Sequence, residues 1–401
     1  MQQELLVCPK KLHTNNINIQ VASRKALPQS NKHALSSRSR LVSVIKPSIT
    51  SQHTRFLKRQ LQLSACQVTF HSKLIWQPIE FLRFLKNLHQ ISLDFSYHRQ
   101  LDDKHIFELA KSLVILWNVN KLDLNFKLCV NITDQALARL TRGITALKNM
   151  ENLNINLSSC SSIKGKSLAN LFNCLYRFQR LKVLKLDLEA CKLNNNIVSI
   201  LARSLIRLKN MQEVYLNLTS SVGVTDEDFS ALSKSLSTMT NLTSLHLNIS
   251  SCKNLTSKAL SQFSKNISGL KNLKTFEIIS NQNSFINNED LSNLGADVAK
   301  LGSLETLVLD FGSCRMINEE GIEVFGENIK GLEGLKKLRL NVSYISNVTE
   351  NGIRNFHMKL KENIRELKEV EYYVGYIKVI NSKNIDGFMA ENSGNGLQGC
   401  R

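Results

Sequence analysis

Several features are scarce in this 401-residue chain, and each scarcity argues against a class of protein. No apolar run approaches the roughly 18 residues that cross a bilayer, although the stretch from Ser112 to Trp117 is among the longest. The first ten residues lack the basic-then-apolar layout of a secretory signal. The sequence contains no P-loop, kinase catalytic loop, HExxH or GxSxG motif. We therefore expect a non-enzymatic, intracellular protein, cytoplasmic or alternatively mitochondrial.

Proline, glycine and acidic residues are unevenly distributed along the chain. All 4 prolines and none of the 17 glycines lie in residues 1–80. This stretch carries 12 Lys and Arg but only two acids, Glu4 and Glu80, so it supplies +10 of the formal net charge of +19. A basic, Ser-containing segment with so little apolar patterning is expected to be largely disordered. Its composition also fits a mitochondrial transit peptide, but its length and the early Glu4 favour a solvated basic leader.

From Leu88 onward a single hydrophobic pattern repeats nine times. A hydrophobic residue is followed three and five residues later by further hydrophobics, as in Leu88, Ile91 and Leu93. Successive copies begin 31 residues apart, with one interval of 30, at Leu88, Val119, Met150, Leu181, Met211, Leu242, Leu273, Leu304 and Leu335. Alternating hydrophobics predict a short strand with one buried face. The pattern predicts a repeat domain over residues 81–380, followed by a disordered tail over residues 381–401.

A helix is predicted in the second half of each repeat. A residue suited to the start of a helix recurs in phase, with Lys164 as the exception: Asp102, Thr133, Asn194, Thr225, Thr256, Asn287, Asn318 and Thr349. A strand and a helix cannot cover their own apolar faces, so neighbouring repeats must stack. The expected fold is an α/β solenoid, a right-handed horseshoe with a parallel sheet on its concave face and helices on its convex face. A degenerate strand around Val370–Val379, 35 residues after Leu335, is expected to cap it.

Two repeats carry a further signature after their strands. The stretches Leu153-Asn-Ile155-Asn-Leu157-Ser-Ser-Cys160 and Leu245-His-Leu247-Asn-Ile249-Ser-Ser-Cys252 place a cysteine at the same position. They resemble leucine-rich repeats of the ribonuclease-inhibitor-like class, whose long units contain a helix and a Cys or Asn after the strand. The resemblance covers residues 88 to about 360. It implies the horseshoe fold, but members of the class serve as enzyme inhibitors, GTPase-activating proteins, ubiquitin-ligase substrate receptors and scaffolds.

The cysteines and glycines do not predict a cofactor or metal site. Five of the nine cysteines share the position after the strand: Cys129, Cys160, Cys191, Cys252 and Cys314. Residues one repeat apart stand on successive levels of a solenoid, whereas a metal needs several thiolates around one ion. We expect buried, reduced thiols there. The Gly394-Asn-Gly396-Leu-Gln-Gly399 match to a dinucleotide motif lies in the predicted tail, without a helix after it.

The solvent-facing strand positions form the expected concave surface. Two such positions are predicted in each of the nine repeats, and among them five residues are acidic and two are Lys or Arg. This surface is therefore not expected to bind nucleic acid. The second half mixes apolar and aromatic side chains with polar ones, which is typical of protein-binding patches. The predicted partner-binding residues are Tyr215, His246, Glu277, Ile279, Val308 and Asp310.

The sequence therefore favours a non-catalytic scaffold that binds a protein partner on its concave face. It is expected to be monomeric in isolation, with no membrane contact, and nucleic acid would bind only through the leader. Three alternatives stay open. One is an organellar or ribosome-associated protein whose leader binds RNA, and another is a ubiquitin-ligase substrate receptor, for which Pro78-Ile-Glu80-Phe-Leu gives only a faint adaptor-like match. The last is a GTPase activator, although the acidic tail typical of such proteins is missing.

Overall fold

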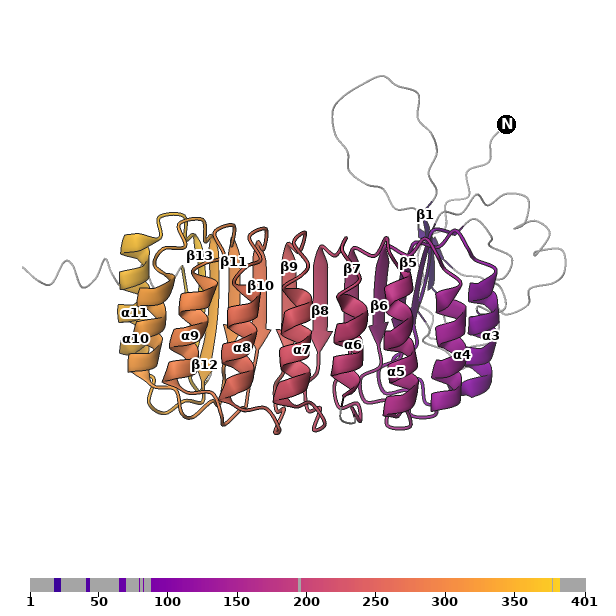
Figure 1. Cartoon of the computed structure of the whole chain (residues 1–401), viewed down its shortest axis with the longest axis horizontal. Helices are drawn as coiled ribbons and strands as arrows, with labels where there is room; N and C mark the ends of the chain where they lie inside the picture. The colour runs from indigo at the N-terminus through magenta and orange to yellow at the C-terminus, as the bar shows by residue number, and fades with distance from the viewer. Residues whose placement is uncertain are drawn as a thin grey trace, which may run out of the picture.

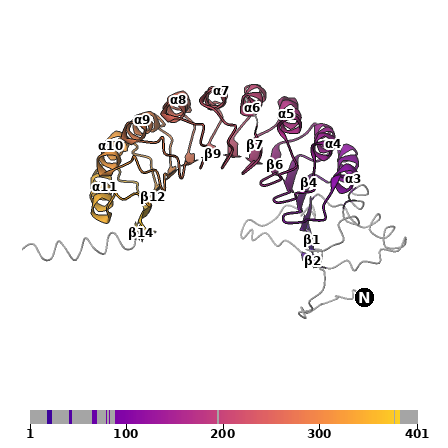
Figure 2. The ribbon, with the colours of Figure 1, turned by 90° about the horizontal axis from the view of Figure 1, so that it is seen from below.

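The computed structural model describes residues 18–22, 41–43, 65–69, 79, 82, 88–193, 196–376 and 378–382. Strands and helices alternate along the main body, and the strands lie side by side behind the helices (Figure 1). Seen along the strands, the body is an arc with strands on its inner side and helices on its outer side (Figure 2). This is the leucine-rich-repeat solenoid that the repeat pattern predicts.

The alternating hydrophobics of each repeat form one strand of a parallel sheet. Strand residues pair in register, so that Leu122, Leu153, Leu184, Val214 and Leu245 stand next to one another on consecutive strands. The strands are β4 (Gln90–Asp94), β5 (Lys121–Asn125), β6 (Asn152–Asn156), β7 (Val183–Asp187), β8 (Glu213–Asn217), β9 (Ser244–Asn248), β10 (Thr275–Ile279), β11 (Thr306–Asp310), β12 (Lys337–Ser343) and β13 (Glu369–Gly375).

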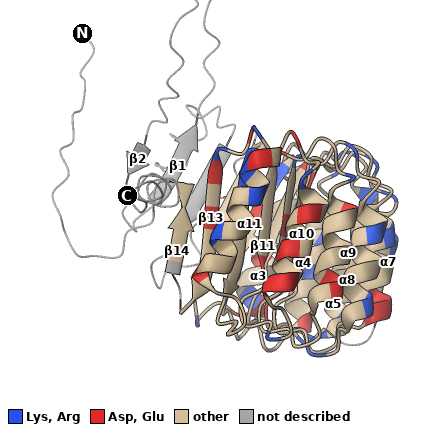
Figure 3. Cartoon of the chain, turned by 90° about the vertical axis from the view of Figure 1, so that its left-hand side faces the viewer, with Lys and Arg blue, Asp and Glu red and all other residues tan. Residues whose placement is uncertain are grey.

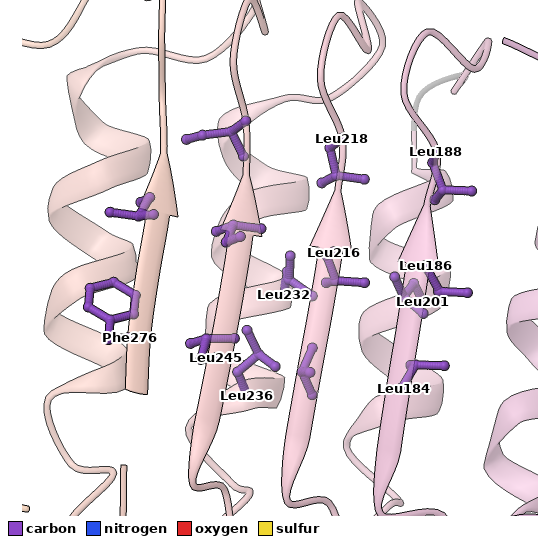
Figure 4. Close-up of a cluster of buried hydrophobic side chains, with 14 of the residues drawn as sticks. Leu184, Leu186, Leu188, Leu201, Leu216, Leu218, Leu232, Leu236, Leu245 and Phe276 are labelled. Carbon is purple, nitrogen blue, oxygen red and sulfur yellow. The ribbon is translucent and has the colours of Figure 1, made fainter. Parts of the chain in front are cut away.

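Each strand from β4 to β12 is followed by a loop and a helix that packs behind it. The helices are α3 (Asp103–Val114), α4 (Asp134–Thr145), α5 (Gly165–Cys174), α6 (Ile197–Leu205), α7 (Asp226–Leu236), α8 (Ser257–Ile267), α9 (Asn288–Val298), α10 (Glu319–Ile329) and α11 (Glu350–Asn363). The strand leucines point toward the helices, and helix residues such as Leu201, Leu232 and Leu236 meet them (Figure 4). The strand and helix of one repeat cannot bury their own apolar side chains, so neighbouring repeats share them. The hydrophobic core is therefore continuous through all the repeats.

Most helices begin at the predicted residue. The side chains of Asp102, Thr133, Thr225, Asn287, Asn318 and Thr349 accept hydrogen bonds from first-turn amides, as helix-starting residues do. Two predictions need correction. Thr256 precedes α8, as predicted, but its side chain accepts no capping bond; its hydroxyl donates to Asp226. Asn194 lies outside the described residues, and Asn196, at a φ of 70°, is the residue that precedes α6.

The carboxy end of the sheet corrects the predicted repeat length. Leu338 of β12 pairs with Val370 of β13, so the last repeat is displaced by 32 residues and not by 35. Leu367, which is buried, is therefore the residue that corresponds to Leu335. The sequence analysis had aligned Val370 with Leu335. Strand β14 (Lys378–Asn381) then pairs antiparallel with β13 and ends the sheet.

Three strands described within residues 1–80 continue the sheet at its other end. Strand β3 (Ala65–Thr69) pairs parallel with β4, β1 (Asn18–Ala22) pairs antiparallel with β3, and β2 (Leu41–Ser43) pairs antiparallel with β1. Most of the leader, like residues 383–401, lies outside the described residues, and its predicted disorder stays a prediction.

The repeated cysteines bind the carbonyl of the preceding repeat. Each of the five thiols is buried and donates to the backbone oxygen 34 residues earlier, as Cys160 Sγ does to Phe126 O at 3.1 Å. Asn283 takes the same position in its repeat and donates to Ile249 O at 3.0 Å. Burial raises the pKa of Cys160, Cys252 and Cys314 to about 11. The thiols are therefore structural donors in the protonated form.

This burial predicts low thiol reactivity in the folded protein. At least six of the nine cysteines, namely Cys174 and the five repeated ones, should resist a thiol-specific reagent at neutral pH, because a protonated thiol is a poor nucleophile. All nine should react once the chain is unfolded in denaturant. Counting modified thiols by mass spectrometry checks this, and modification of any of the six in the native protein would contradict it.

Candidate functional site

The concave face is built from three rows of outward-pointing side chains. The first, third and fifth residues of each strand are on the concave side, where most are half-buried and Asn217 is buried. The sequence analysis considered only the third and fifth. The first row is Gln90, Lys121, Asn152, Val183, Glu213, Ser244, Thr275, Thr306, Lys337 and Glu369. The middle row is Ser92, Asp123, Asn154, Lys185, Tyr215, His246, Glu277, Val308, Arg339 and Glu371.

The third row has a structural role. In eight repeats its residue is Asp or Asn, and the side-chain oxygen accepts a hydrogen bond from the amide two residues later, which begins a tight turn. We call it the Asx row: Asp94, Asn125, Asn156, Asp187, Asn217, Asn248, Asp310 and Asn341. Ile279 stands where a ninth member would be, and there Ser250 Oγ accepts from the Asn281 amide at 3.1 Å. These turns carry the chain from the sheet to the convex side.

The Asx row is also connected across repeats. Asp187 accepts from Asn217 Nδ2 at 3.0 Å, from Asn156 Nδ2 at 3.2 Å and from its own turn amide at Glu189. Burial raises the pKa of Asp187, although these donors act in the opposite direction. Asp187 therefore joins three neighbouring repeats through one carboxylate.

The middle row brings three of the predicted partner-binding residues together. The rings of Tyr215 and His246 lie on β8 and β9 with centroids 6.3 Å apart. His246 Nδ1 lies 2.6 Å from Glu277 Oε2 on β10, and its Nε2 lies 2.8 Å from Ser244 Oγ. Burial, followed by the charges of Asp187 and Glu277, raises the pKa of Tyr215. The half-buried set forms a continuous polar and aromatic strip across three strands.

The other predicted residues lie close to this strip but differ in role. Val308 continues the middle row on β11, next to Glu277. Ile279 adds an apolar side chain to the third row, on β10. Asp310 belongs to the Asx row, where its oxygens accept from the Gly312 amide and from Asn281 Nδ2 at 3.2 Å each. Partner binding by the six residues stays a prediction.

A hollow of about 440 Å³ lies over β4–β8, in the other half of the face. Its lining includes Ser92, Asp123, Asn154, Lys185 and Tyr215 of the middle row. The middle-row side chains of β4, β5 and β6 are short, whereas those of Lys185, Tyr215 and His246 on β7, β8 and β9 are large. The run of short side chains was the available sequence signal for this hollow, and the sequence analysis did not use it.

Asp123 is one of three aspartates that line the hollow. It accepts from Asn154 Nδ2 at 2.9 Å and from Ser92 Oγ at 3.3 Å. Burial raises its pKa, with the Ser92 hydrogen bond and nearby Lys121 acting in the opposite direction. The hollow thus combines a partly desolvated carboxylate with amide and hydroxyl groups, which suits a ligand that donates hydrogen bonds.

The charges of the concave face disfavour a polyanion. The three rows on β4–β13 contain eight acids and four bases. Three of the bases pair with acids of the next strand: Lys185 with Glu213 at 2.6 Å, Lys337 with Glu369 at 3.0 Å, and Arg339 with Glu371 at 2.7 Å. Acidic and basic residues are interspersed over the described strands and helices (Figure 3). Rows of unpaired Lys and Arg, which a nucleic-acid groove requires, are absent from this described face.

Within the described residues, no group of three or more His, Cys, Asp or Glu side chains could hold a metal ion. No described helix is long and apolar enough to cross a membrane. The Gly394–Gly399 motif lies outside the described residues. The described concave face therefore offers hydrogen-bonding, acidic and aromatic groups spread over several strands.

Comparisons with known proteins add little to this description. No protein-family model and no curated protein matches the chain. Among solved structures, the leucine-rich repeat-containing protein LegL7 of Legionella pneumophila is 14% identical with a TM-score of 0.44, covering 83% of this chain and 98% of that one. A chain of the yeast Rad7 and Elc1 complex is 16% identical with a TM-score of 0.43, covering 74% and 73% respectively. The fold rests on the chain's own repeats.

Proposed function

We propose that this chain is a non-catalytic scaffold that binds a partner protein on its concave face, between β4 and β11. The observation that carries the proposal is the contrast between rows. Core positions repeat because they fill the solenoid, and the Asx row repeats because it makes the turns. The middle row changes chemically from strand to strand, and an extended surface of non-repeating side chains is how solenoids recognise partners.

The middle row also indicates the chemistry of the partner. Tyr215 and His246 supply aromatic surface at the rim of the acidic hollow, where a partner can bury apolar contacts while donating hydrogen bonds to Asp123. Aromatic side chains at the centre of a patch with polar surroundings are typical of protein interfaces. A partner segment that carries Lys or Arg beside an apolar residue fits this arrangement.

A pair of substitutions tests the proposal. Changing Tyr215→Asp together with Ile279→Asp adds two charges to the predicted patch without touching the core, and we expect recovery of partners by affinity purification to fall at least about tenfold. The matched control is Tyr176→Asp with Val324→Asp, which makes the same kind of change at exposed positions after α5 and on α10. Quantitative mass spectrometry reads both. Equal partner recovery from both variants would contradict the proposal.

A second candidate function is supported by the leader. Its +10 charge, in contrast to the excess of acids on the concave face, suits contact with RNA phosphates while the solenoid binds protein. Since β3 pairs with β4, deletion of residues 1–80 would disturb the sheet, and neutralising Arg38, Arg40, Lys58 and Arg59 to Gln is the sharper test. Salt-sensitive RNA binding by the parent that is lost in this variant would support the candidate. Binding unchanged by the variant would contradict it.

The ubiquitin-ligase receptor alternative depends on the stretch around Ile79. Ile79 and Leu82 are buried in the same core as the repeats, and Ser112 Oγ donates to Ile79 O at 3.2 Å. Both side chains therefore help to cover the first repeat, which supports a capping role for this stretch over a free adaptor-binding one.

A further inference from the structure

The convex side carries a groove between α3 and α4, away from the concave face. Its volume is about 500 Å³, and its apolar floor is formed by Phe107, Ala110 and Val114 of α3 together with Gly143 of α4. The two helices are adjacent at the end of the arc (Figure 2). This groove is therefore separate from the concave surface that we propose binds a partner.

Gly143 allows α4 to approach α3 closely at the floor of the groove. A Cβ built on it would lie 2.7 Å from Ala110 O, so the two helices touch through their backbones there. In several later repeats the corresponding residue donates a hydrogen bond to the neighbouring helix, as Asn266 Nδ2 does to Ser233 Oγ at 2.8 Å. In the α3–α4 pair the two backbones meet directly, and Gly143 adds no side chain to the floor.

Four basic residues line the groove. Lys104 and Lys111 project from α3, and Arg139 and Arg142 project from α4; all four are exposed. The Arg139 guanidinium lies 5.7 Å from the Phe107 ring centroid. Glu108, which pairs with Lys111 at 2.7 Å, is the acid among the lining residues. The rim is thus strongly positive around an apolar floor.

Exposed apolar residues also stand at the end of α3 and directly after it. Val114 is 53% exposed and Trp117 is 61% exposed, with Ile115 between them. Phosphate groups would use the basic rim but not this apolar surface, whereas an amphipathic protein segment would use both. Exposed apolar surface that is bordered by polar or charged residues is typical of protein-binding sites.

We propose that the α3–α4 groove binds an acidic, amphipathic segment of a partner protein, with an apolar side chain packed on the apolar floor and carboxylates facing Lys104, Arg139 and Arg142. The chain's own leader is the wrong occupant because residues 1–80 carry 12 bases and 2 acids. The scaffold would then have two independent binding surfaces, one concave and one convex.

Selection from a phage library of short random peptides tests this proposal on the full chain. The selected peptides are then measured against the variant Arg139→Glu with Arg142→Glu. We expect peptides that combine Asp or Glu with Leu, Phe or Trp, and a loss of affinity of at least about tenfold on the variant. The control is Lys258→Glu with Lys265→Glu, which reverses two exposed charges on α8 and should leave affinity unchanged.

A second variant protects the test against misfolding. Lys104→Glu with Lys111→Glu changes only exposed side chains of α3 and should weaken the same peptides, while circular dichroism verifies the fold of each variant. Selected peptides without acidic residues, or with equal affinity for all variants, would overturn the proposal. Binding of poly(U) RNA that is lost in the same variants, or self-association lost in them, would also overturn it, in favour of nucleic acid or of a second copy. None of these outcomes bears on the concave face.

Discussion

Replacing Phe263 by Ala should reduce the free energy of unfolding by about 3–5 kcal/mol, the largest stability effect expected of a single substitution here. Phe263 of α8 is fully buried in the middle of the solenoid. Its ring stacks on Phe229 of α7 with centroids 5.0 Å apart and lies 6.3 Å from Phe276 of β10. Removing the ring leaves a cavity that touches three successive repeats.

The same substitution should also change the shape of the unfolding curve. Because each repeat packs only against its neighbours, a weakened central repeat uncouples the two halves of the solenoid. We expect two transitions in urea where the parent shows one, read by circular dichroism. Lys265→Ala on the exposed face of α8 is the control and should change stability by less than about 0.5 kcal/mol. A single transition with a similarly small loss for Phe263→Ala would contradict the continuous core.

The second large effect is expected at Asp187. Asp187→Ala leaves Asn156 Nδ2, Asn217 Nδ2 and the Glu189 amide without their acceptor, and a buried donor left unpaired costs about 1–3 kcal/mol. Since these groups are partly solvated, we expect a total loss of about 2–4 kcal/mol, measured by urea unfolding. Asp187→Asn keeps an acceptor oxygen and should lose much less.

The pH dependence of the Asn variant separates hydrogen bonding from charge. Burial raises the pKa of Asp187, so the folded state holds its proton more tightly than the unfolded chain does. The parent therefore loses stability as pH rises from the ordinary aspartate value through the raised value, and the Asn variant lacks this loss. The difference in unfolding free energy should shift in favour of Asp187→Asn from acid pH to pH 7. A shift in the opposite direction would show that the carboxylate is stabilised in the folded state.

Much of the fold could be predicted because the hydrophobic pattern within each repeat and the spacing between repeats indicate the same structure. Period-two hydrophobics at a constant spacing fix both the strands and their register, so Leu122, Leu153 and Leu184 could be aligned from the sequence alone. Most helix starts were predicted from their capping side chains, with Lys164 and Thr256 as exceptions in repeats of standard length. The start of α6 was misplaced because its repeat is one residue short, and the last strand was misaligned because its repeat is one residue long.

The site was harder to predict because it depends on relations between repeats. The hollow over β4–β8 arises from side-chain lengths on neighbouring strands, and no single repeat contains that information. The Asx row looked like a set of acidic and polar surface groups, but Asp94, Asp187 and Asp310 are engaged in turns. Tyr215 was predicted correctly as outward-facing, and it lies where the hollow meets the aromatic strip. The identity of the partner depends on the surface of another molecule, which this sequence does not describe.

Photo-crosslinking from the concave face tests the central claim most directly. A photoreactive phenylalanine analogue is placed at Tyr215, on the rim of the hollow, and in a second protein at Tyr176, at the end of α5. Both replace tyrosine with a similar ring, so each variant should fold and retain its partners. The account predicts that a co-purified partner is crosslinked from position 215 and not from position 176. Crosslinking from position 176 with none from position 215 would contradict the claim that the concave face binds the partner.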